Sequence, residues 1–178
     1  RILVFSQVQH SHLIGGIQME IKVSEVMQRE DNSLYLKEIE VINYEKVEIL
    51  NTPDNVVKLM TDVFEINKKI SEEIFVIALT TDSKPLHFFR LNRGTVNTSL
   101  FDTRGLMISL LLANASTFVI VHNHPSGSIT PSKPDIDITQ KLNKAAELLG
   151  LTFADHIIIG AKGTHYSFME VYRDLDKV

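Results

Sequence analysis

Two histidines, a serine and an aspartate lie within fourteen residues of this chain, at positions 122–135, and their spacing suits a metal ion. His122 and His124 are two positions apart, so both imidazoles point to the same side if the backbone there is extended. Asp135 follows at the start of a predicted helix and can add a carboxylate oxygen. Two nitrogens, one carboxylate oxygen and one open position are typical of a catalytic zinc site. The segment therefore predicts hydrolysis by a metal-activated water.

Each part of this segment also has an ordinary interpretation. A His-x-His pair at the end of a strand is often a pair of surface or capping histidines. Ser132 and Asp135 match the Ser-x-x-acid pattern of a capping box at the start of a helix. The two interpretations are compatible, because a helix start gives a metal ligand a rigid base. Taken together, the residues favour the metal.

Hydrolysis also needs a group that accepts a proton from the attacking water, and a carboxylate suits this role. Glu72 and Glu73 stand directly before the apolar run at 74–79, which is predicted to be a buried strand. Each is also typical of a solvated side chain at the start of a strand. Periodicity alone does not select either one as the base.

The elements that position these residues follow from hydrophobic periodicity. The strand predicted over 117–121 delivers the chain directly to His122. A capping Thr52 followed by Pro53 predicts the start of an amphipathic helix. Alternating helices and strands predict an α/β sheet with helices packed on it. The predicted strands cover 17–23, 34–50, 74–79, 86–91, 117–121, 151–159 and 166–168, and the predicted helices cover 53–69, 102–113 and 138–149.

Composition limits the classes of protein to which the chain can belong. Its 178 residues suit one domain with an appended segment, and the polar stretch at 28–33 predicts a division into 1–32 and 33–178. Cysteine is absent, which excludes disulfides, thiolate ligands and a cysteine nucleophile, and fits a cytoplasmic protein. A net charge of −4 without a basic block weakens a role in nucleic-acid binding. No apolar run reaches the length of a membrane span.

Residues 122–127 together with Pro131, Ser132 and Asp135 resemble the JAMM signature of the RadC family, in the JAB/MPN metalloprotease superfamily. The resemblance covers the chain from about Ser33 to its C-terminal region and leaves residues 1–32 outside. It includes a Glu-x-Phe strand beginning at Glu73. It also includes segments at 97–104, 155–160 and 166–168.

By position, the resemblance implies that His122, His124 and Asp135 bind Zn²⁺. It implies that Glu73 is the general base, and that Ser132 orients the water or stabilises the oxyanion. The expected fold is a mixed β-sheet sandwiched by helices, with a cytidine-deaminase-like architecture. The expected substrate is a peptide or protein, cleaved at a peptide or isopeptide bond. Deaminase chemistry itself is excluded, because it requires a Pro-Cys-x-x-Cys pair.

The chain departs from the family pattern in two places. It has Asp-Thr-Arg-Gly at 102–105 where many relatives carry His-Pro-Arg-Glu, and residues 1–32 show no helix-hairpin-helix module. The first departure leaves the ligands intact but weakens the expectation for substrate positioning, and the second leaves a DNA role with little support. The alternative function, from a different class, is a metal-stabilised binding module without turnover, such as an accessory protein of DNA repair or of a mobile element. Asp155 and His156 lie in an apolar stretch, where a histidine is either a buried core residue or a partner of a ligand histidine.

Overall fold

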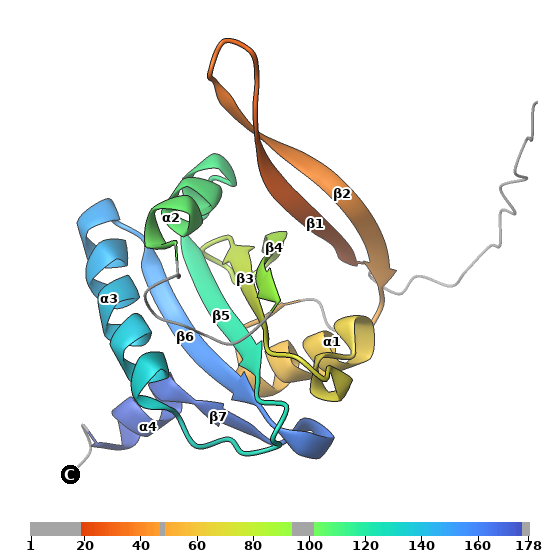
Figure 1. The fold of residues 1–178 in the computed structure, drawn as a ribbon, viewed down its shortest axis with the longest axis vertical. Helices are drawn as coiled ribbons and strands as arrows, with labels where there is room; N and C mark the ends of the chain where they lie inside the picture. The colour runs from red at the N-terminus through yellow and green to blue at the C-terminus, as the bar shows by residue number, and fades with distance from the viewer. Residues whose placement is uncertain (1–18, 47–48, 94–101, 176–178) are drawn as a thin grey trace, which may run out of the picture.

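The computed structural model describes residues 19–46, 49–93 and 102–175. Within these residues, seven strands form one mixed sheet with the order β2-β1-β4-β3-β5-β6-β7 (Figure 1). The pairs β1–β4 and β5–β6 are parallel, and the other neighbours are antiparallel. The strands are β1 (Met19–Gln28), β2 (Leu34–Tyr44), β3 (Glu73–Leu79), β4 (Pro85–Arg93), β5 (Thr117–Asn123), β6 (Thr152–Ile159) and β7 (His165–Ser167).

Helices cover both faces of this sheet, and their starts carry the expected caps. Thr52 caps α1, and Asp102 caps α2 through the N–H of Gly105. Ser132 caps α3, which closes on the left-handed Gly150. The helices are α1 (Pro53–Phe64), α2 (Thr103–Leu112), α3 (Lys133–Leu149) and α4 (Phe168–Leu175), with single 3₁₀ turns η1 (Ile66–Lys68) and η3 (Ala161–Gly163).

Among the described residues, two apolar clusters hold the layers together, one on each face of the sheet. The first joins α1 to side chains such as Phe75, Phe88 and Val121. The second joins α2 and α3 to the opposite face, where Phe89 and Ile120 are buried. The α/β fold with a mixed sheet between helices is thereby confirmed. In the described part of the chain, no helix is both long and apolar enough to cross a membrane.

Several predicted boundaries differ from the structure. The helix predicted over 53–69 ends at Phe64, because Glu65 adopts a left-handed conformation with φ of 48°. The strand predicted to reach residue 50 ends at Tyr44. The polar stretch at 28–33, predicted to separate two parts of the chain, forms the turn of the β1–β2 hairpin. Both strands of that hairpin belong to the sheet, and residues 1–18 lie outside the described residues.

Candidate metal centre

The two histidines come from the end of β5, an internal strand of the sheet. His122 is buried on the face that α3 covers, and its register partner on β3 is Ile74. His124 follows two residues later, so its ring lies on the same side. The Nε2 atoms of the two rings are 3.1 Å apart. As predicted, the spacing of the histidines brings both imidazoles together.

Asp135 reaches the same point from the first turn of α3. Its Oδ1 lies 3.3 Å from Nε2 of His122, and its Oδ2 lies 3.6 Å from Nε2 of His124. The predicted capping box is present, and it also holds this carboxylate in place. The hydroxyl and the backbone N–H of Ser132 donate to Oδ2 of Asp135 over 2.6 and 2.7 Å. The role expected for Ser132 at the oxyanion stays a prediction, since its hydroxyl is directed to Asp135.

Glu72 is the fourth member of the cluster, and neither hydrophobic periodicity nor the family resemblance selected it. Its Oε1 lies 3.7 Å from Nε2 of His122 and 3.8 Å from Nε2 of His124. Glu73, the expected base, lies elsewhere, with its carboxylate 3.7 Å from Nε of Arg90. Adjacent residues of an extended segment point to opposite faces, so only one of the two glutamates can face the histidines. The structure brings Glu72, and not Glu73, to the candidate site.

Asn123, between the two histidines, holds the segment that carries Glu72. Its side chain accepts a hydrogen bond from the backbone N–H of Glu73 over 2.8 Å. It also donates to the carbonyl of Ser71 over 3.1 Å. Both bonds flank Glu72 and fix the entry to β3 against the end of β5. The middle residue of the His-x-His motif therefore positions the fourth member of the cluster.

The donor atoms of the cluster have the spacing that a small divalent cation requires. One ligand atom from each of Glu72, His122, His124 and Asp135 lies within 4.8 Å of the others. Tetrahedral zinc with bonds of about 2.0–2.1 Å separates its ligand atoms by about 3.3 Å. The contacts between the two histidines and Asp135 bracket this value, and those to Glu72 are longer. Two imidazoles and carboxylate oxygens are also ligands that zinc accepts.

Burial keeps His122 of the cluster, and His156 behind it, neutral. Loss of hydration lowers the pKa of His122 to about 4, although the nearby Asp135 carboxylate opposes part of this shift. The same cause lowers the pKa of His156 well below its ordinary value. A neutral imidazole has a lone pair for a metal, whereas an imidazolium does not. At neutral pH His122 is therefore in the form that metal binding requires.

His156 lies directly behind His122 and joins it to α3. Its Nε2 is 2.9 Å from Nδ1 of His122, and its Nδ1 is 2.6 Å from the hydroxyl of Thr139. Asp155 instead accepts bonds from the hydroxyl of Ser167 and the N–H of Met169. Burial raises the pKa of Asp155. His156 thus fits both alternatives given for it, being a buried residue and the partner of a candidate ligand histidine.

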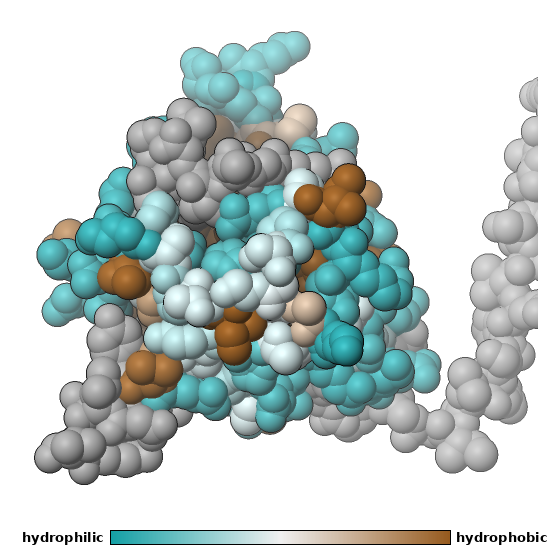
Figure 2. All heavy atoms as spheres, turned by 60° about the horizontal axis from the view of Figure 1, so that its bottom comes forward, coloured by the Kyte–Doolittle hydropathy of each residue, from teal (hydrophilic) through white to brown (hydrophobic). Residues whose placement is uncertain are grey.

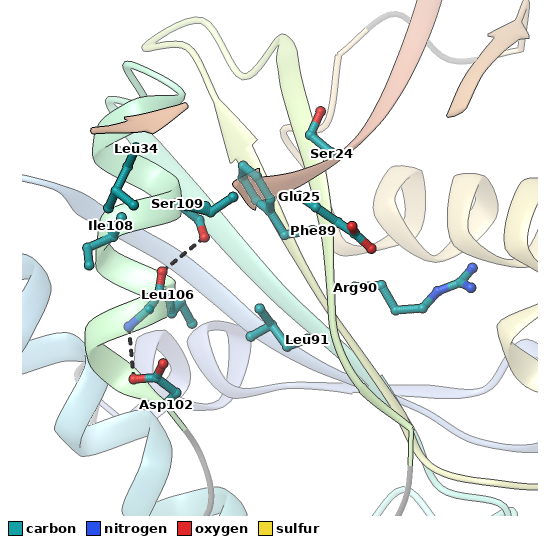
Figure 3. Close-up of a pocket in the computed structure, with 12 residues that line it drawn as sticks. Ser24, Glu25, Leu34, Phe89, Arg90, Leu91, Asp102, Leu106, Ile108 and Ser109 are labelled. Carbon is teal, nitrogen blue, oxygen red and sulfur yellow. Dashed lines mark hydrogen bonds between the residues drawn. The ribbon is translucent and has the colours of Figure 1, made fainter. Parts of the chain in front are cut away.

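The site lies at the end of the molecule where β5 passes into α3. Figure 2 turns this end forward, and its hydrophobic residues appear as separate patches on a mostly pale or hydrophilic surface. A different hollow of 380 Å³ lies between β1, β4 and α2, and its lining residues include Glu25, Phe89 and Leu106 (Figure 3). None of the four cluster residues lines this hollow. The four cluster residues and this hollow are therefore separate features of the molecule.

Comparisons with known proteins agree with this architecture. The family model described as "RadC-like JAB domain" matches residues 50–174. A UPF0758 protein of Porphyromonas gingivalis is 40% identical over 99 residues, which are 56% of this chain and 44% of that protein. A UPF0758 protein of Finegoldia magna is 34% identical over 112 residues, which are 63% of this chain and 49% of that protein. A UPF0758 protein of Thermotoga maritima is 41% identical over 99 residues, which are 56% of this chain and 44% of that protein.

The match is confined to part of each of these relatives, since the chain spans less than half of their length. Within the matched range lie all four cluster residues, from Glu72 to Asp135. The expected family segment at 97–100 falls outside the described residues. The family model covers well over half of the chain, from before α1 into α4. The chain is a member of the RadC family of JAB-domain proteins.

Proposed function

We propose that this protein is a zinc-dependent hydrolase that cleaves a peptide or isopeptide bond. One observation carries the proposal: two carboxylates and two imidazoles converge within 4.8 Å at the end of β5. Asp135 and His122 are both buried there, with about 1% of their surface exposed. A buried carboxylate with a second carboxylate close by is unfavourable without a compensating cation. A bound divalent metal ion supplies that compensation.

His122, His124 and Asp135 would hold the zinc, because their contacts with one another are the shortest in the cluster. When bound, the ion would lower the pKa of a water molecule and polarise the substrate carbonyl. Glu72 stands slightly farther from both histidines, as a group that contacts the water rather than the ion would. This arrangement gives Glu72 the role that the family resemblance gave to Glu73.

The proton then follows a short path through Glu72. Its carboxylate accepts one proton as the water oxygen adds to the carbonyl carbon of the substrate. It returns that proton to the amine nitrogen as the carbon–nitrogen bond breaks, so that acid and amine are the products. Only 16% of the Glu72 side chain is exposed, so it is largely shielded from solvent but still reaches the surface. A single carboxylate can therefore serve both steps.

Two adjacent substitutions test this assignment, since Glu73→Gln is a matched control for Glu72→Gln. We expect the parent to contain about one zinc per chain, and His122→Ala or Asp135→Ala to lose it. Glu72→Gln should keep the zinc and lose about 10²- to 10⁴-fold in cleavage rate on a peptide library that includes lysine isopeptides. Glu73→Gln should keep the rate per folded molecule and lose some stability, because its pairing with Arg90 is weakened.

The outcomes separate the competing assignments. Loss of zinc from Glu72→Gln would make Glu72 a ligand rather than the base. A rate lost in Glu73→Gln and retained in Glu72→Gln would return the role to Glu73 and refute the assignment from geometry. A parent that binds zinc but cleaves no library member would instead support a metal-stabilised binding module.

A further inference from the structure

A continuous chain of hydrogen bonds links two of the candidate ligands through the protein interior. It begins at the backbone carbonyl of Asp135, which accepts from the hydroxyl of Thr139 over 2.6 Å. It continues from the Thr139 hydroxyl to Nδ1 of His156 over 2.6 Å. It ends between Nε2 of His156 and Nδ1 of His122, which are 2.9 Å apart. All four residues are buried.

The carbonyl end fixes the direction of every bond in this chain. A carbonyl oxygen only accepts, so the single hydrogen of the Thr139 hydroxyl points to Asp135. The Thr139 oxygen must then accept from Nδ1–H of His156. A neutral imidazole has one N–H, so Nε2 of His156 has a lone pair and accepts from Nδ1–H of His122. His122 is left with no hydrogen on Nε2.

The surroundings of His156 hold this ring in one orientation. Phe168 stacks on the ring with centroids 4.9 Å apart and planes within 8°. His156 has only 2% of its surface exposed and lies between a hydroxyl and an imidazole. A charged ring there would lose its hydration without gaining a directly bonded carboxylate, so the neutral form is favoured.

We propose that Thr139 and His156 are positioning residues that fix the tautomer of His122. They hold its proton on Nδ1 and thereby direct the lone pair of Nε2 toward His124 and Asp135. A single hydrogen bond fixes the tautomer of the other candidate ligand histidine, since Nδ1 of His124 lies 2.9 Å from the carbonyl of Ser128. That carbonyl only accepts, so Nδ1 of His124 carries a hydrogen, and the lone pair of the neutral ring lies on Nε2. Two lone pairs then face each other over 3.1 Å, an arrangement that favours a cation between them.

Removing the Thr139 hydroxyl should reverse the direction of the hydrogen bond between His156 and His122. In Thr139→Val, Nδ1–H of His156 loses its acceptor, so the His156 proton moves to Nε2 and is donated to Nδ1 of His122. His122 must then place its own proton on Nε2, where the metal would bind. We expect zinc affinity to fall about 10- to 100-fold, as for other groups that orient metal ligands. Thr139→Ser keeps the hydroxyl and should retain both the parent tautomer and the parent affinity.

The test reads the tautomer in the metal-free full chain by two-bond ¹⁵N–¹H correlation of the histidine rings, and reads zinc affinity by competition with a chelator. The parent should show His122 protonated on Nδ1, and Thr139→Val should show it protonated on Nε2. A parent protonated on Nε2 would overturn the proposal even if Thr139→Val did not fold. An unchanged tautomer in folded Thr139→Val would overturn it too. The measurement of zinc affinity rests on the proposed function, but the tautomer in metal-free protein does not. A failure of zinc binding can therefore be distinguished from a failure of the proposed hydrogen-bond network.

Discussion

Replacing Ser132 with alanine separates two roles that this residue could have. Its hydroxyl donates to Oδ2 of Asp135 over 2.6 Å and accepts from the Asp135 N–H over a longer 3.3 Å. The substitution removes both bonds but keeps the donation from the Ser132 backbone N–H to the same Oδ2 over 2.7 Å. The Asp135 carboxylate is thus left with one protein donor on that oxygen instead of two.

The magnitude follows from these bonds. Loss of an N-terminal serine cap costs about 1 kcal/mol, and loss of a hydrogen bond to a charged group costs about 1.5–3 kcal/mol. The two terms share one hydroxyl and are not additive, so we expect the metal-free protein to lose about 2 kcal/mol. For a chain of this length that lowers Tm by about 4–8 °C. Looser positioning of Asp135 should also weaken zinc binding by about 10-fold or more.

The assay combines thermal unfolding of chelated protein, zinc affinity by competition, and kcat at saturating zinc. If Ser132 acts only through Asp135, kcat at saturating zinc should stay near that of the parent. A direct role at the oxyanion would instead lower kcat by about 10²–10³-fold. Ser126→Ala is the matched control, because the Ser126 hydroxyl only accepts from the Ser128 N–H in an exposed loop. Unchanged Tm and zinc affinity in Ser132→Ala would refute the reasoning.

Three further results are expected. Asn123→Ala should cost about 2–3 kcal/mol in urea unfolding, because it leaves the Glu73 N–H and the Ser71 carbonyl without their buried partner. It should also lower kcat, since Glu72 lies between these two groups. In metal-free protein kept with a chelator, burial of His122 should make the free energy of unfolding fall as pH drops from about 6.5 to about 4, because the unfolded state binds more protons in this pH range. The expected loss is about 3 kcal/mol, measured from urea unfolding midpoints. Adding free zinc at about 100 times its Kd should raise stability by about 2.7 kcal/mol at pH 7, and a chelator should reverse the gain in Tm.

Most of the fold could be predicted from local chemistry, because caps and periodicity are encoded by neighbouring residues. The caps at Thr52 and Ser132 were predicted and are present. The end of α1 was not predicted, since Glu65 takes a left-handed conformation that a glycine or asparagine would have signalled. The turn at 28–33 was recognised as a break, but composition does not tell what a turn joins. In the structure, that turn joins two strands of one sheet.

The candidate site shows the same division between local and distant information. His122, His124 and Asp135 could be predicted, because their spacing along the chain already places them on one side of a strand and at a helix start. The choice between Glu72 and Glu73 could not, because it depends on how β3 is aligned with β5, about fifty residues away. In that alignment Ile74 pairs with His122, so position 72 shares the histidine face and position 73 does not. A one-residue difference in register would exchange the two glutamates.

The His-Asn-His sequence itself encodes the register that selects Glu72. Alternation along β5 sends His122 and His124 to one face and Asn123 to the other. The amide of Asn123 then binds the backbone of residues 71 and 73, which fixes β3 at one position along β5. A shift of β3 by one residue would bring Glu73 to the histidines, but it would break both of these bonds and turn the buried side chains of β3 to the wrong faces. The three residues that look like two ligands and a spacer therefore also align β3, and with it Glu72, the proposed base that directly precedes this strand.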